Sequence, residues 1–365
     1  MAEPNIVAEF STISGTDEEL AKYYLTENGN DLERALNMFF ANQSCQDDVI
    51  ILEDEDSPER RVQSEPVAAE ESDEDVICLD DTMETEAASS SSAGLPISDT
   101  RSAGDRHLKL ISWNIEGLEK EMLKERTVAV INTLKRESPD VVFLQEVIPL
   151  SLNMLQERFC DSYHVFPGGK FAYFTAILLK KETFHLETVL VEPFPNSQML
   201  RNLIIAKAKC QGISLQLMTS HIESMANQSE ERKSQLRSIF ARMTGAGTDT
   251  VSIFGGDTNA KDREIFDLAR ERSDIEDVWE TVGSPPESRF TWDMSQNDNL
   301  NMNGGKPRLR YDRVYLHQKT KSLSPVNFSL IGKERLACGM FASDHWGILT
   351  DFKVHQDSTS ASRGT

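Results

Sequence analysis

The spacing of apolar residues along the chain changes near residue 106. Before that point, Leu20, Tyr24 and Leu25, and then the apolar residues from Leu32 to Phe40, recur at helical spacing, which predicts two short amphipathic helices. The polar residues that fit their N-terminal capping boxes are Thr16, Glu19, Asn30 and Glu33. With a further helix around Ile6 to Phe10, the pattern predicts a three-helix unit over residues 1–45.

After residue 106, short apolar runs typical of strands dominate the chain. They lie at 108–113, 141–144, 173–179, 203–208, 213–219, 251–254, 310–316 and 346–354. Helical runs intervene around Leu123 to Leu134 and around Leu236 to Met243. Strands mixed with helices over 106–356 predict one α/β domain, with two packed sheets and helices outside them. Residues 357–365 are expected to be a disordered tail.

The charge divides the chain at about the same place. Residues 1–100 hold 26 acidic and 4 basic residues, which is a net charge of −22, and residues 101–365 hold 34 of each. Residues 46–105 carry the acidic runs 53–56 and 70–75 and the serines 89–92, with few large apolar side chains. Such a segment lacks the apolar surface that offsets its ordering entropy, so a disordered acidic linker is predicted there.

Composition also bounds the compartment. No apolar run approaches the roughly 18 residues of a membrane span, and Glu3 and Glu9 stand where a secretory signal is apolar. The five cysteines are an odd number without a Cys-x-x-Cys pair, which is typical of reduced thiols. We expect a protein of the nucleus, also found in the cytoplasm, with no membrane partner.

Polar residues cluster where the predicted strands end or begin. Four strands are followed by polar residues, one contains Asp312, and one is preceded by Asp344 and His345; the residues after the four strands are Asn114, Gln145, Glu146, His221, Glu223, Asp257, Thr258 and Asn259. A single such position is usually a turn. Because ligand sites of α/β sheets lie at strand ends, six of them in one domain predict a common cleft.

The chemistry of these residues suits metal-assisted phosphodiester hydrolysis. Glu146, helped by the Asn114 amide, fits a hard cation such as Mg²⁺, with Mn²⁺ as a substitute. Asp257 is suited to hold and deprotonate an attacking water, with Asn259 on a phosphate oxygen. His345 paired with Asp312 would be a cation beside the phosphate.

Two other kinds of hydrolase fit the sequence less well. A zinc site is disfavoured because there is neither a paired cysteine nor a His-Glu-x-x-His motif. A serine hydrolase is disfavoured because there is no Gly-x-Ser-x-Gly elbow.

Six short motifs resemble those of the endonuclease/exonuclease/phosphatase superfamily of Mg²⁺-dependent phosphoesterases. They are Trp-Asn-Ile-Glu-Gly, Leu-Gln-Glu, Thr-Ser-His-Ile-Glu-Ser, Gly-Gly-Asp-Thr-Asn, Tyr-Asp-Arg and Ser-Asp-His-Trp-Gly. The resemblance covers roughly 108–354 and implies a four-layer α/β sandwich. It implies catalytic roles for Asn114, Glu146, His221, Asp257, Asn259, Asp312, Asp344 and His345.

Further stretches, such as Leu-Gln-Glu-Val-Ile-Pro and Pro-Phe-Pro-Asn-Ser-Gln-Met-Leu-Arg-Asn-Leu, resemble the tyrosyl-DNA phosphodiesterases of this superfamily. That resemblance implies hydrolysis of the 5′-phosphotyrosyl bond between DNA ends and trapped topoisomerase II, in double-strand break repair. The residues assigned to single-stranded ends are Arg201, Ser224, Lys261, Trp292, Tyr311 and Tyr173, with Arg263 weaker. Core packing for the aromatic rings and a solvated surface for the basic residues are the alternatives.

Three short segments outside the α/β domain suggest protein partners. Residues 1–45 resemble a UBA-like domain, which implies ubiquitin binding; a helical bundle that serves folding alone is the alternative. Residues 47–54 and 74–81 are apolar cores in acidic flanks, a pattern that resembles SUMO-interacting motifs, which add a strand to a partner sheet. Apolar stretches of a solvated tail without a partner would look the same.

Two other functions remain open from the sequence. Within the superfamily, an abasic-site endonuclease or another phosphoesterase shares the catalytic motifs. A ubiquitin- or SUMO-binding adaptor with an inert α/β domain is the alternative of another class.

Overall fold

The computed structural model describes residues 6–7, 10–11, 18–27, 35, 106–170, 173–300 and 305–355. The acidic linker, the C-terminal tail, both candidate SUMO-binding segments and most of the third N-terminal helix lie outside the described residues. The domain boundaries drawn from the sequence therefore stay predictions.

In the N-terminal segment, helix α2 spans Glu18–Glu27. One face of it is buried in a small apolar cluster made of Val7, Phe10, Ala21, Tyr24, Leu25 and Ala35. The Phe10 and Tyr24 rings stack within this cluster, with their centroids 6.0 Å apart. Residues at helical spacing in the sequence thus share one core.

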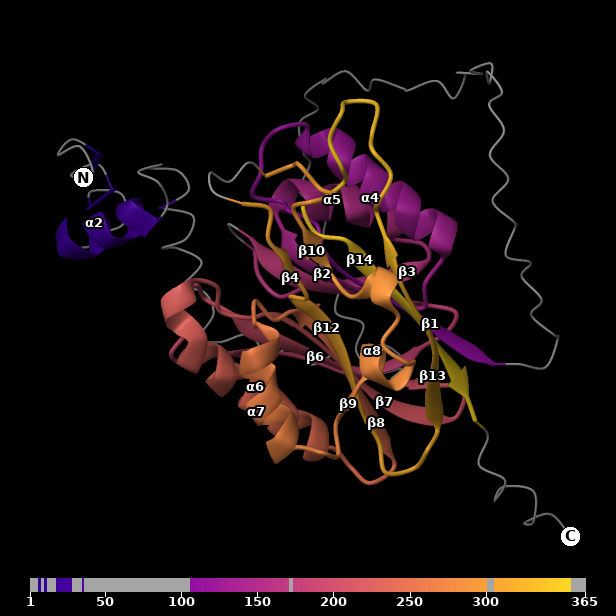
Figure 1. Cartoon of the computed structure of the whole chain (residues 1–365). Coiled ribbons are helices and arrows are strands. Elements are labelled where there is room, and N and C mark those ends of the chain that lie inside the picture. The colour runs from indigo at the N-terminus through magenta and orange to yellow at the C-terminus, as the bar shows by residue number, and fades with distance from the viewer. Residues whose placement is uncertain are drawn as a thin grey trace, which may run out of the picture. The chain divides into compact units, whose positions relative to one another are not determined.

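Two six-stranded sheets form the larger domain (Figure 1). The first has the order β13-β14-β1-β2-β4-β3, with β1 (His107–Asn114), β2 (Val141–Val147), β3 (Tyr163–Pro167), β4 (Phe174–Lys180), β13 (Leu323–Ile331) and β14 (Gly347–Val354). The second has the order β5-β6-β7-β8-β12-β9, with β5 (His185–Pro193), β6 (Asn202–Cys210), β7 (Ile213–His221), β8 (Thr250–Asp257), β9 (Glu276–Asp277) and β12 (Asp312–His317). A two-stranded sheet pairs β10 (Trp292–Asp293) with β11 (Arg308–Leu309).

The helices lie outside the two sheets. They are α4 (Leu123–Glu137), α5 (Pro149–Phe159), α6 (Ser229–Thr244), α7 (Asp262–Glu271) and the short α8 (Val278–Thr281), with 3-10 turns η1 (Ala226–Gln228) and η2 (Pro286–Ser288). None of the described helices combines the length and the apolar character that crossing a membrane requires.

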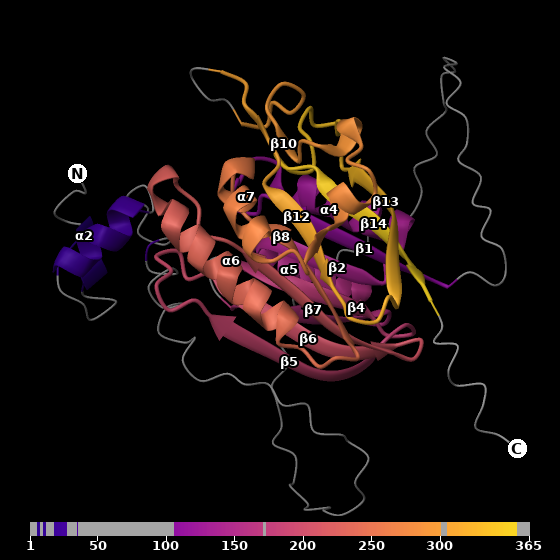
Figure 2. The same ribbon diagram turned by 60° about the horizontal axis from the view of Figure 1, so that its bottom comes forward.

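Three apolar layers hold these elements together. The middle layer lies between the sheets and includes Phe143 and Ile177 of the first sheet and Leu217 of the second. A second layer packs α4 and α5 on the first sheet, and a third packs α6 and α7 on the second sheet (Figure 2). The order helix, sheet, sheet, helix confirms the predicted four-layer sandwich.

Each sheet contains one parallel pair at its centre. β1 pairs in parallel with β2, and β7 with β8; α4 and α6 make the crossovers that such pairs require. Asn114 is therefore the register partner of Gln145, and His221 that of Asp257. The polar residues that follow these strands gather at the carboxyl ends of both pairs.

The two sheets approach each other closely at this end. A Cβ atom on Gly255 of the second sheet would lie 2.7 Å from Phe143 Cδ2 of the first, so a larger residue there would displace the Phe143 ring. Within the second sheet, a Cβ on Gly256 would lie 2.1 Å from the Ser220 carbonyl oxygen, so only glycine fits at that position. Gln145 Nε2 donates to Thr219 Oγ1 across the gap, at 3.1 Å. The spacing of the sheets is thereby fixed beside the polar cluster.

Candidate active site

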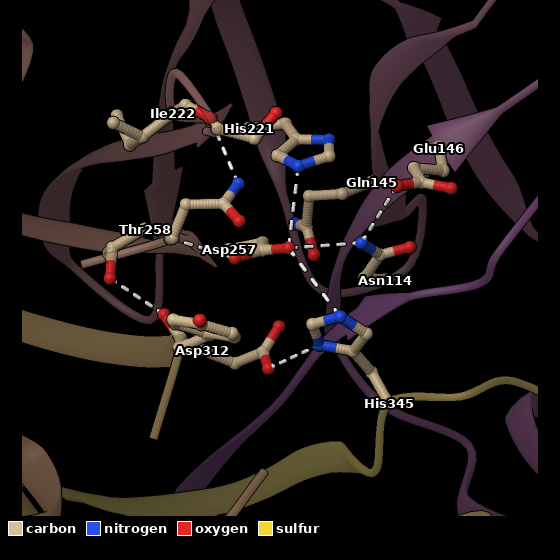
Figure 3. A network of polar contacts seen from close by, with 12 residues as sticks. Asn114, Gln145, Glu146, His221, Ile222, Asp257, Thr258, Asp312 and His345 are labelled. Atoms are coloured by element: carbon tan, nitrogen blue, oxygen red, sulfur yellow. Dashed lines mark hydrogen bonds and ion pairs between the residues drawn. The ribbon is translucent and has the colours of Figure 1, made fainter. Parts of the chain in front are cut away.

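Six of the eight predicted catalytic residues come together beside one cleft at the carboxyl ends of the parallel strands (Figure 3); they are Asn114, Glu146, His221, Asp257, Asp312 and His345. The strands β1, β2, β7 and β8 deliver Asn114, Glu146, His221 and Asp257. β12 runs antiparallel beside β8, so its first residue, Asp312, lies opposite Asp257. The residues that line the cleft include Asn114, Leu118, Glu146, Tyr173, Met199, Arg201, His221, Ser224, Met225, Asp257, Asn259 and His345.

Asp257 lies at the centre of this cluster and is buried. Its Oδ2 accepts a hydrogen bond from Asn114 Nδ2 at 3.0 Å and lies 3.3 Å from His221 Nε2. Its Oδ1 accepts the Asn259 backbone amide at 2.9 Å. Burial alone would raise the pKa of this carboxyl, but the nearby histidines and hydrogen bonds lower it below its usual value. Asp257 is therefore an anion at neutral pH.

His345 and Asp312 form a buried pair beside Asp257. His345 Nδ1 lies 2.8 Å from Asp312 Oδ2, and its Nε2 lies 3.8 Å from Asp257 Oδ2. Burial would lower the pKa of the imidazole, but Asp312, Asp344 and Asp257 outweigh it and raise that pKa well above 6.5. His345 is thus held as a cation that faces the cleft.

His221 is the opposite case. Burial, and then the Arg201 guanidinium, lower its pKa to about 3, so the ring is neutral. Its Nδ1 is buried without a partner in the described structure, which places the ring proton on Nε2, facing Asp257. One histidine of the cleft is therefore charged and the other is a neutral hydrogen-bond donor.

Glu146 and Asn114 form the predicted metal-binding pair. Asn114 Nδ2 donates to Glu146 Oε1 at 3.2 Å, while Asn114 Oδ1 accepts the Glu116 backbone amide at 3.0 Å. In this arrangement Asn114 supports Glu146 through an amide hydrogen and does not point its oxygen at a cation. Burial and the repulsion of Asp344 raise the pKa of Glu146 to about 7.

The backbone at Glu146 is left-handed, with φ +55°, where the pairing of β2 with β4 is interrupted. A Cβ on Gly117 would lie 2.1 Å from the Glu146 carbonyl oxygen. Such strained positions persist only where the surroundings enforce them, and they are concentrated at functional sites. The bulge turns the Glu146 side chain toward the cleft.

A second group of side chains also has the geometry of a metal site. Single ligand atoms of Asp257, Asp312 and His345 all lie within 4.8 Å of one another. In the structure, however, the His345 imidazolium already uses Nδ1 to bind Asp312. A charged imidazole is a poor metal ligand, so this group and Glu146 are two separate candidate positions for a cation.

Arg201 enters the cleft from the loop between β5 and β6. The residue is buried, its Cζ lies 5.0 Å from the centre of the Tyr173 ring, and its Nη2 lies 3.4 Å from Ser224 Oγ. The Tyr173 ring meets the His221 ring edge-on, with centroids 6.3 Å apart. The structure thus brings the three predicted substrate-binding residues Tyr173, Arg201 and Ser224 together.

Trp292 and Tyr311 form an aromatic pair with centroids 5.7 Å apart. Both residues are half-buried, so neither is plain core. Trp292 Nε1 donates to Asp344 Oδ2 at 3.0 Å, which gives the predicted residue Asp344 a role in holding this pair next to His345.

The remaining predicted residues are placed less centrally. Asn259 lines the cleft, and its Nδ2 donates to the Ile222 carbonyl oxygen at 3.1 Å, which leaves one amide hydrogen for a ligand. Lys261 and Arg263 are exposed and do not contribute to the cleft lining.

Sequence reasoning missed three features of the cleft. Leu118, Met199 and Met225 add an apolar lining, for which the sequence carried no signal. Glu116, inside the quoted motif Trp-Asn-Ile-Glu-Gly, binds Arg126 Nη1 at 3.1 Å and the Asp344 backbone amide at 2.8 Å. Glu223, in Thr-Ser-His-Ile-Glu-Ser, was noted but given no role.

Comparison with known sequences agrees with this geometry. Residues 111–345 match the endonuclease/exonuclease/phosphatase family, and residues 5–44 match a UBA-like domain. A Xenopus laevis protein named tyrosyl-DNA phosphodiesterase 2 is 37% identical over 94% of this chain and 92% of its own length. The human protein of that name is 36% identical over 96% and 92%.

Solved structures give the same result. A crystal structure of Danio rerio TDP2 complexed with single-strand DNA product has a TM-score of 0.66 and 40% identity, over 68% of this chain and 99% of that one. Caenorhabditis elegans TDP2 has a TM-score of 0.62 and 26% identity, over 97% and 94%. The chain belongs to the endonuclease/exonuclease/phosphatase family and, within it, to the tyrosyl-DNA phosphodiesterase 2 group.

Proposed function

We propose that this chain is a phosphoric diester hydrolase that cleaves the 5′-phosphotyrosyl bond between a DNA end and a trapped topoisomerase II, in double-strand break repair. The observation that carries the proposal is the convergence on one cleft of an anionic Asp257 and a cationic His345, with the Trp292–Tyr311 pair next to His345. These are the parts needed to orient a water, to stabilise phosphate charge and to hold bases.

Asp257 accepts a proton from the attacking water and orients it, since its carboxylate is ionised and hydrogen-bonded in place. His345, held by Asp312, donates from Nε2 toward a phosphate oxygen, where negative charge develops in the transition state. The free amide hydrogen of Asn259 and the Arg201 guanidinium hold further phosphate oxygens.

We assign a divalent cation to Glu146, a carboxylate that lines the cleft beside Asn114. The raised pKa of Glu146 reports a buried carboxylate repelled by Asp344, and a cation at this position would relieve that repulsion. Mg²⁺ takes oxygen ligands and keeps several waters, so one carboxylate suffices, with Mn²⁺ as a substitute. When bound, such a cation neutralises charge on the phosphate oxygens. Glu146 would hold it, and Asn114 would orient Glu146.

Trp292 and Tyr311 supply the surface for a single-stranded end. Stacking on aromatic rings contributes about 1–3 kcal/mol per base and is tolerant of sequence. The neutral charge of residues 101–365 favours such short-range recognition over broad electrostatic binding to duplex DNA.

The test compares three substrates with Mg²⁺: a 5′-phosphotyrosyl oligonucleotide, an abasic duplex and an inositol phosphate. We expect turnover of the first to exceed that of the others by orders of magnitude. Preferred cleavage of the abasic duplex would make the chain an abasic-site endonuclease, and preferred cleavage of the inositol phosphate would make it another phosphoesterase. No turnover of any of them would favour an adaptor.

Ubiquitin and SUMO are the proposed protein partners. The UBA-like match over 5–44 supports ubiquitin binding by residues 1–45, and the two apolar cores within acidic flanks support SUMO binding by 47–54 and 74–81. The proposed location is the nucleus, and also the cytoplasm, which imaging of the tagged full chain would check.

The SUMO proposal predicts different effects for apolar and acidic substitutions. Replacing Ile50, Ile51, Ile77 and Leu79 with Ala should abolish binding at every salt concentration, because these side chains supply the contact area. Neutralising the flanking acids should weaken binding mainly at low salt, since screening acts over about 10 Å at 0.1 M. NMR titration of SUMO against the 45–85 peptide measures both; no shifts at millimolar concentration would leave the linker a spacer.

A further inference from the structure

Glu223 is a buried carboxylate outside the set of groups that face the phosphate. It lies two residues beyond β7, and its exposed fraction is 0%. Its oxygens accept hydrogen bonds from Ser197 Oγ at 2.6 Å, from the Gln198 and Met199 backbone amides at 3.1 Å each, and from Gln235 Nε2 at 3.2 Å. Among the described residues, no lysine or arginine side chain forms an ion pair with it.

This environment requires an anion. All four partners donate, and a carboxylate accepts at both oxygens, whereas an amide in the same place would turn an N–H group toward other donors. A buried carboxylate without a cation is costly unless its hydrogen bonds are complete. An apolar side chain at this position would leave these four donors unpaired, so the carboxylate fixes the groups that donate to it.

What Glu223 holds is the loop between β5 and β6. Ser197 Oγ, bound to Glu223, in turn accepts the Arg201 backbone amide at 2.8 Å. Between them, Leu200 adopts a left-handed backbone with φ +58°, a conformation that needs such support. Glu223 thus fixes the loop at three successive residues, 197 to 199, and Leu200 alone separates them from Arg201.

Arg201 is the residue that this loop delivers to the cleft. Its guanidinium lies among Tyr173, Ser224 and Met199, all of them uncharged, and its Nε is buried without a hydrogen-bond partner. No carboxylate of the described residues forms an ion pair with it. A buried guanidinium with unused donors is prepared for an anion that arrives with the substrate.

We propose that Glu223 is a positioning residue: through Ser197 and the amides of 198 and 199, it fixes the loop that holds Arg201 against the 5′-phosphate of the bound DNA end. This rests on the proposed function for the identity of the ligand. The network also predicts that the effects of changing Glu223 and Arg201 are not additive.

The test measures the affinity of the full chain for a single-stranded oligonucleotide with a 5′-phosphate and for the same oligonucleotide with a 5′-hydroxyl, by fluorescence anisotropy. The unaltered chain should prefer the phosphate. Glu223→Gln should reduce that preference about 10- to 100-fold and leave the affinity for the hydroxyl form unchanged. Arg201→Ala should reduce the phosphate preference by the same factor. The double variant should show no smaller a preference than Arg201→Ala alone.

Glu231→Gln is the matched control. Glu231 Oε1 accepts from the same Gln235 Nε2, at 2.9 Å, and makes no hydrogen bond to the described loop residues 194–201. The phosphate preference of the Glu231→Gln chain should therefore equal that of the unaltered chain. Ser197→Ala removes the hydrogen bonds of Ser197 Oγ to Glu223 and to the Met199 and Arg201 backbone amides and keeps the carboxylate. It should lower the preference in the same direction even if Glu223→Gln fails to fold. A Glu223→Gln chain that keeps the preference, or a loss that adds to that of Arg201→Ala, overturns the proposal.

The two proposals fail separately. If the phosphate preference depends on Glu223 but the chain does not turn over the phosphotyrosyl oligonucleotide, the proposed function is wrong and the positioning role stands. If the unaltered chain turns over the phosphotyrosyl oligonucleotide and Glu223→Gln has the same phosphate preference as the unaltered chain, the proposed function stands and the positioning role is wrong.

Discussion

Asp257 is the residue on which the two sheets depend for their chemistry. It belongs to the second sheet, yet it binds Asn114 of the first sheet and faces His345 on the segment before β14. Burial by itself would raise the pKa of Asp257, and the pKa is lowered only because those donors stay in place. The group that we assign as base is therefore the group most tightly held.

Asp257→Asn should abolish turnover while affinity for the DNA end stays largely unchanged. The substitution removes the proton acceptor and keeps the shape of the side chain, and a positioned general base contributes about 10²- to 10⁴-fold. Single-turnover kinetics and anisotropy measure the two quantities. A variant that retains more than about a tenth of the rate, a loss under roughly 1.4 kcal/mol, would contradict the assignment.

Glu146→Gln should move the midpoint of a Mg²⁺ titration of activity upward by about tenfold or more, by comparison with the losses seen around metal ligands. The substitution removes the anionic oxygen that would bind the cation, and with it the repulsion between Glu146 and Asp344 that a cation would relieve. Glu157→Gln, an exposed change on α5, serves as control. Equal midpoints and rates in both variants would remove Glu146 from the metal site.

At the scale of elements, the apolar pattern identified the centres of the sheets and missed their edges. All eight predicted runs lie in or overlap strands, whereas β3, β13, β5 and β9, which end the two sheets, were not predicted. β5 has alternating exposed residues, and β13 contains Pro325 and a register shift. Edge strands are solvated on one side and interrupted by proline and charge, so their hydrophobic signal is weak.

Helix α7 shows how an element is fixed without a long apolar face. Glu264 Oε1 accepts from Arg232 Nη2 of α6 at 2.8 Å, and both side chains are buried. Burial would raise the pKa of Glu264, but hydrogen bonds from Ser229, the Lys261 amide and Arg232 outweigh it and lower that pKa. The pair ties α7, which begins three residues after Asn259, to α6.

Glu264→Gln should destabilise the protein by about 1.5–3 kcal/mol at pH 7, as expected for hydrogen bonds to a charged group. Because the folded pKa is lowered, this contribution is complete above the unfolded value near 4.5 and disappears as the pH falls through the folded pKa. Urea unfolding from pH 7 to pH 3 measures the difference between the two proteins.

Glu271→Gln on the same helix is the matched control. Its pair with Arg237 is about half-exposed, so its effect should stay below about 1 kcal/mol at every pH. A difference for Glu264→Gln that is constant with pH would show that its ionised form contributes nothing to stability.

At the scale of the whole molecule, charge and chemistry are separated along the chain. The net charge of −22 lies in residues 1–100, and every residue of the cleft that we assign to catalysis lies beyond 106. The D. rerio structure matches 68% of this chain and is itself covered to 99%, so a related catalytic domain crystallises without a counterpart of the rest.

Deleting residues 1–105 should leave kcat/KM on short phosphotyrosyl oligonucleotides within about threefold of the full chain, because no residue that we assign to catalysis is removed. A threefold change corresponds to less than about 1 kcal/mol of activation free energy. The cut retains Arg106, whose carbonyl oxygen accepts the Val354 amide at 2.8 Å. Circular dichroism checks the folding of the shortened chain. A folded product that has lost its activity would contradict the modular interpretation.

The sequence by itself determined the class of fold and the types of residue in the cleft, while the domain boundary that it places near residue 106 stays a prediction. Buried central strands are read from apolar runs, and the polar residues that interrupt them, such as Asn114, Glu146 and Asp257, are visible at their ends. These are local properties, and no knowledge of the packing is needed to see them.

Only the tertiary structure decided how those residues are charged and paired. His221 and His345 look alike in the sequence, yet burial beside Arg201 makes one neutral, and Asp312 makes the other a cation. The same holds for Glu223, whose partners at 197 to 199 lie on a different hairpin. A pKa and a hydrogen-bond partner depend on which distant groups the two sheets bring within a few ångströms, and that distance is not encoded in any single segment of the chain.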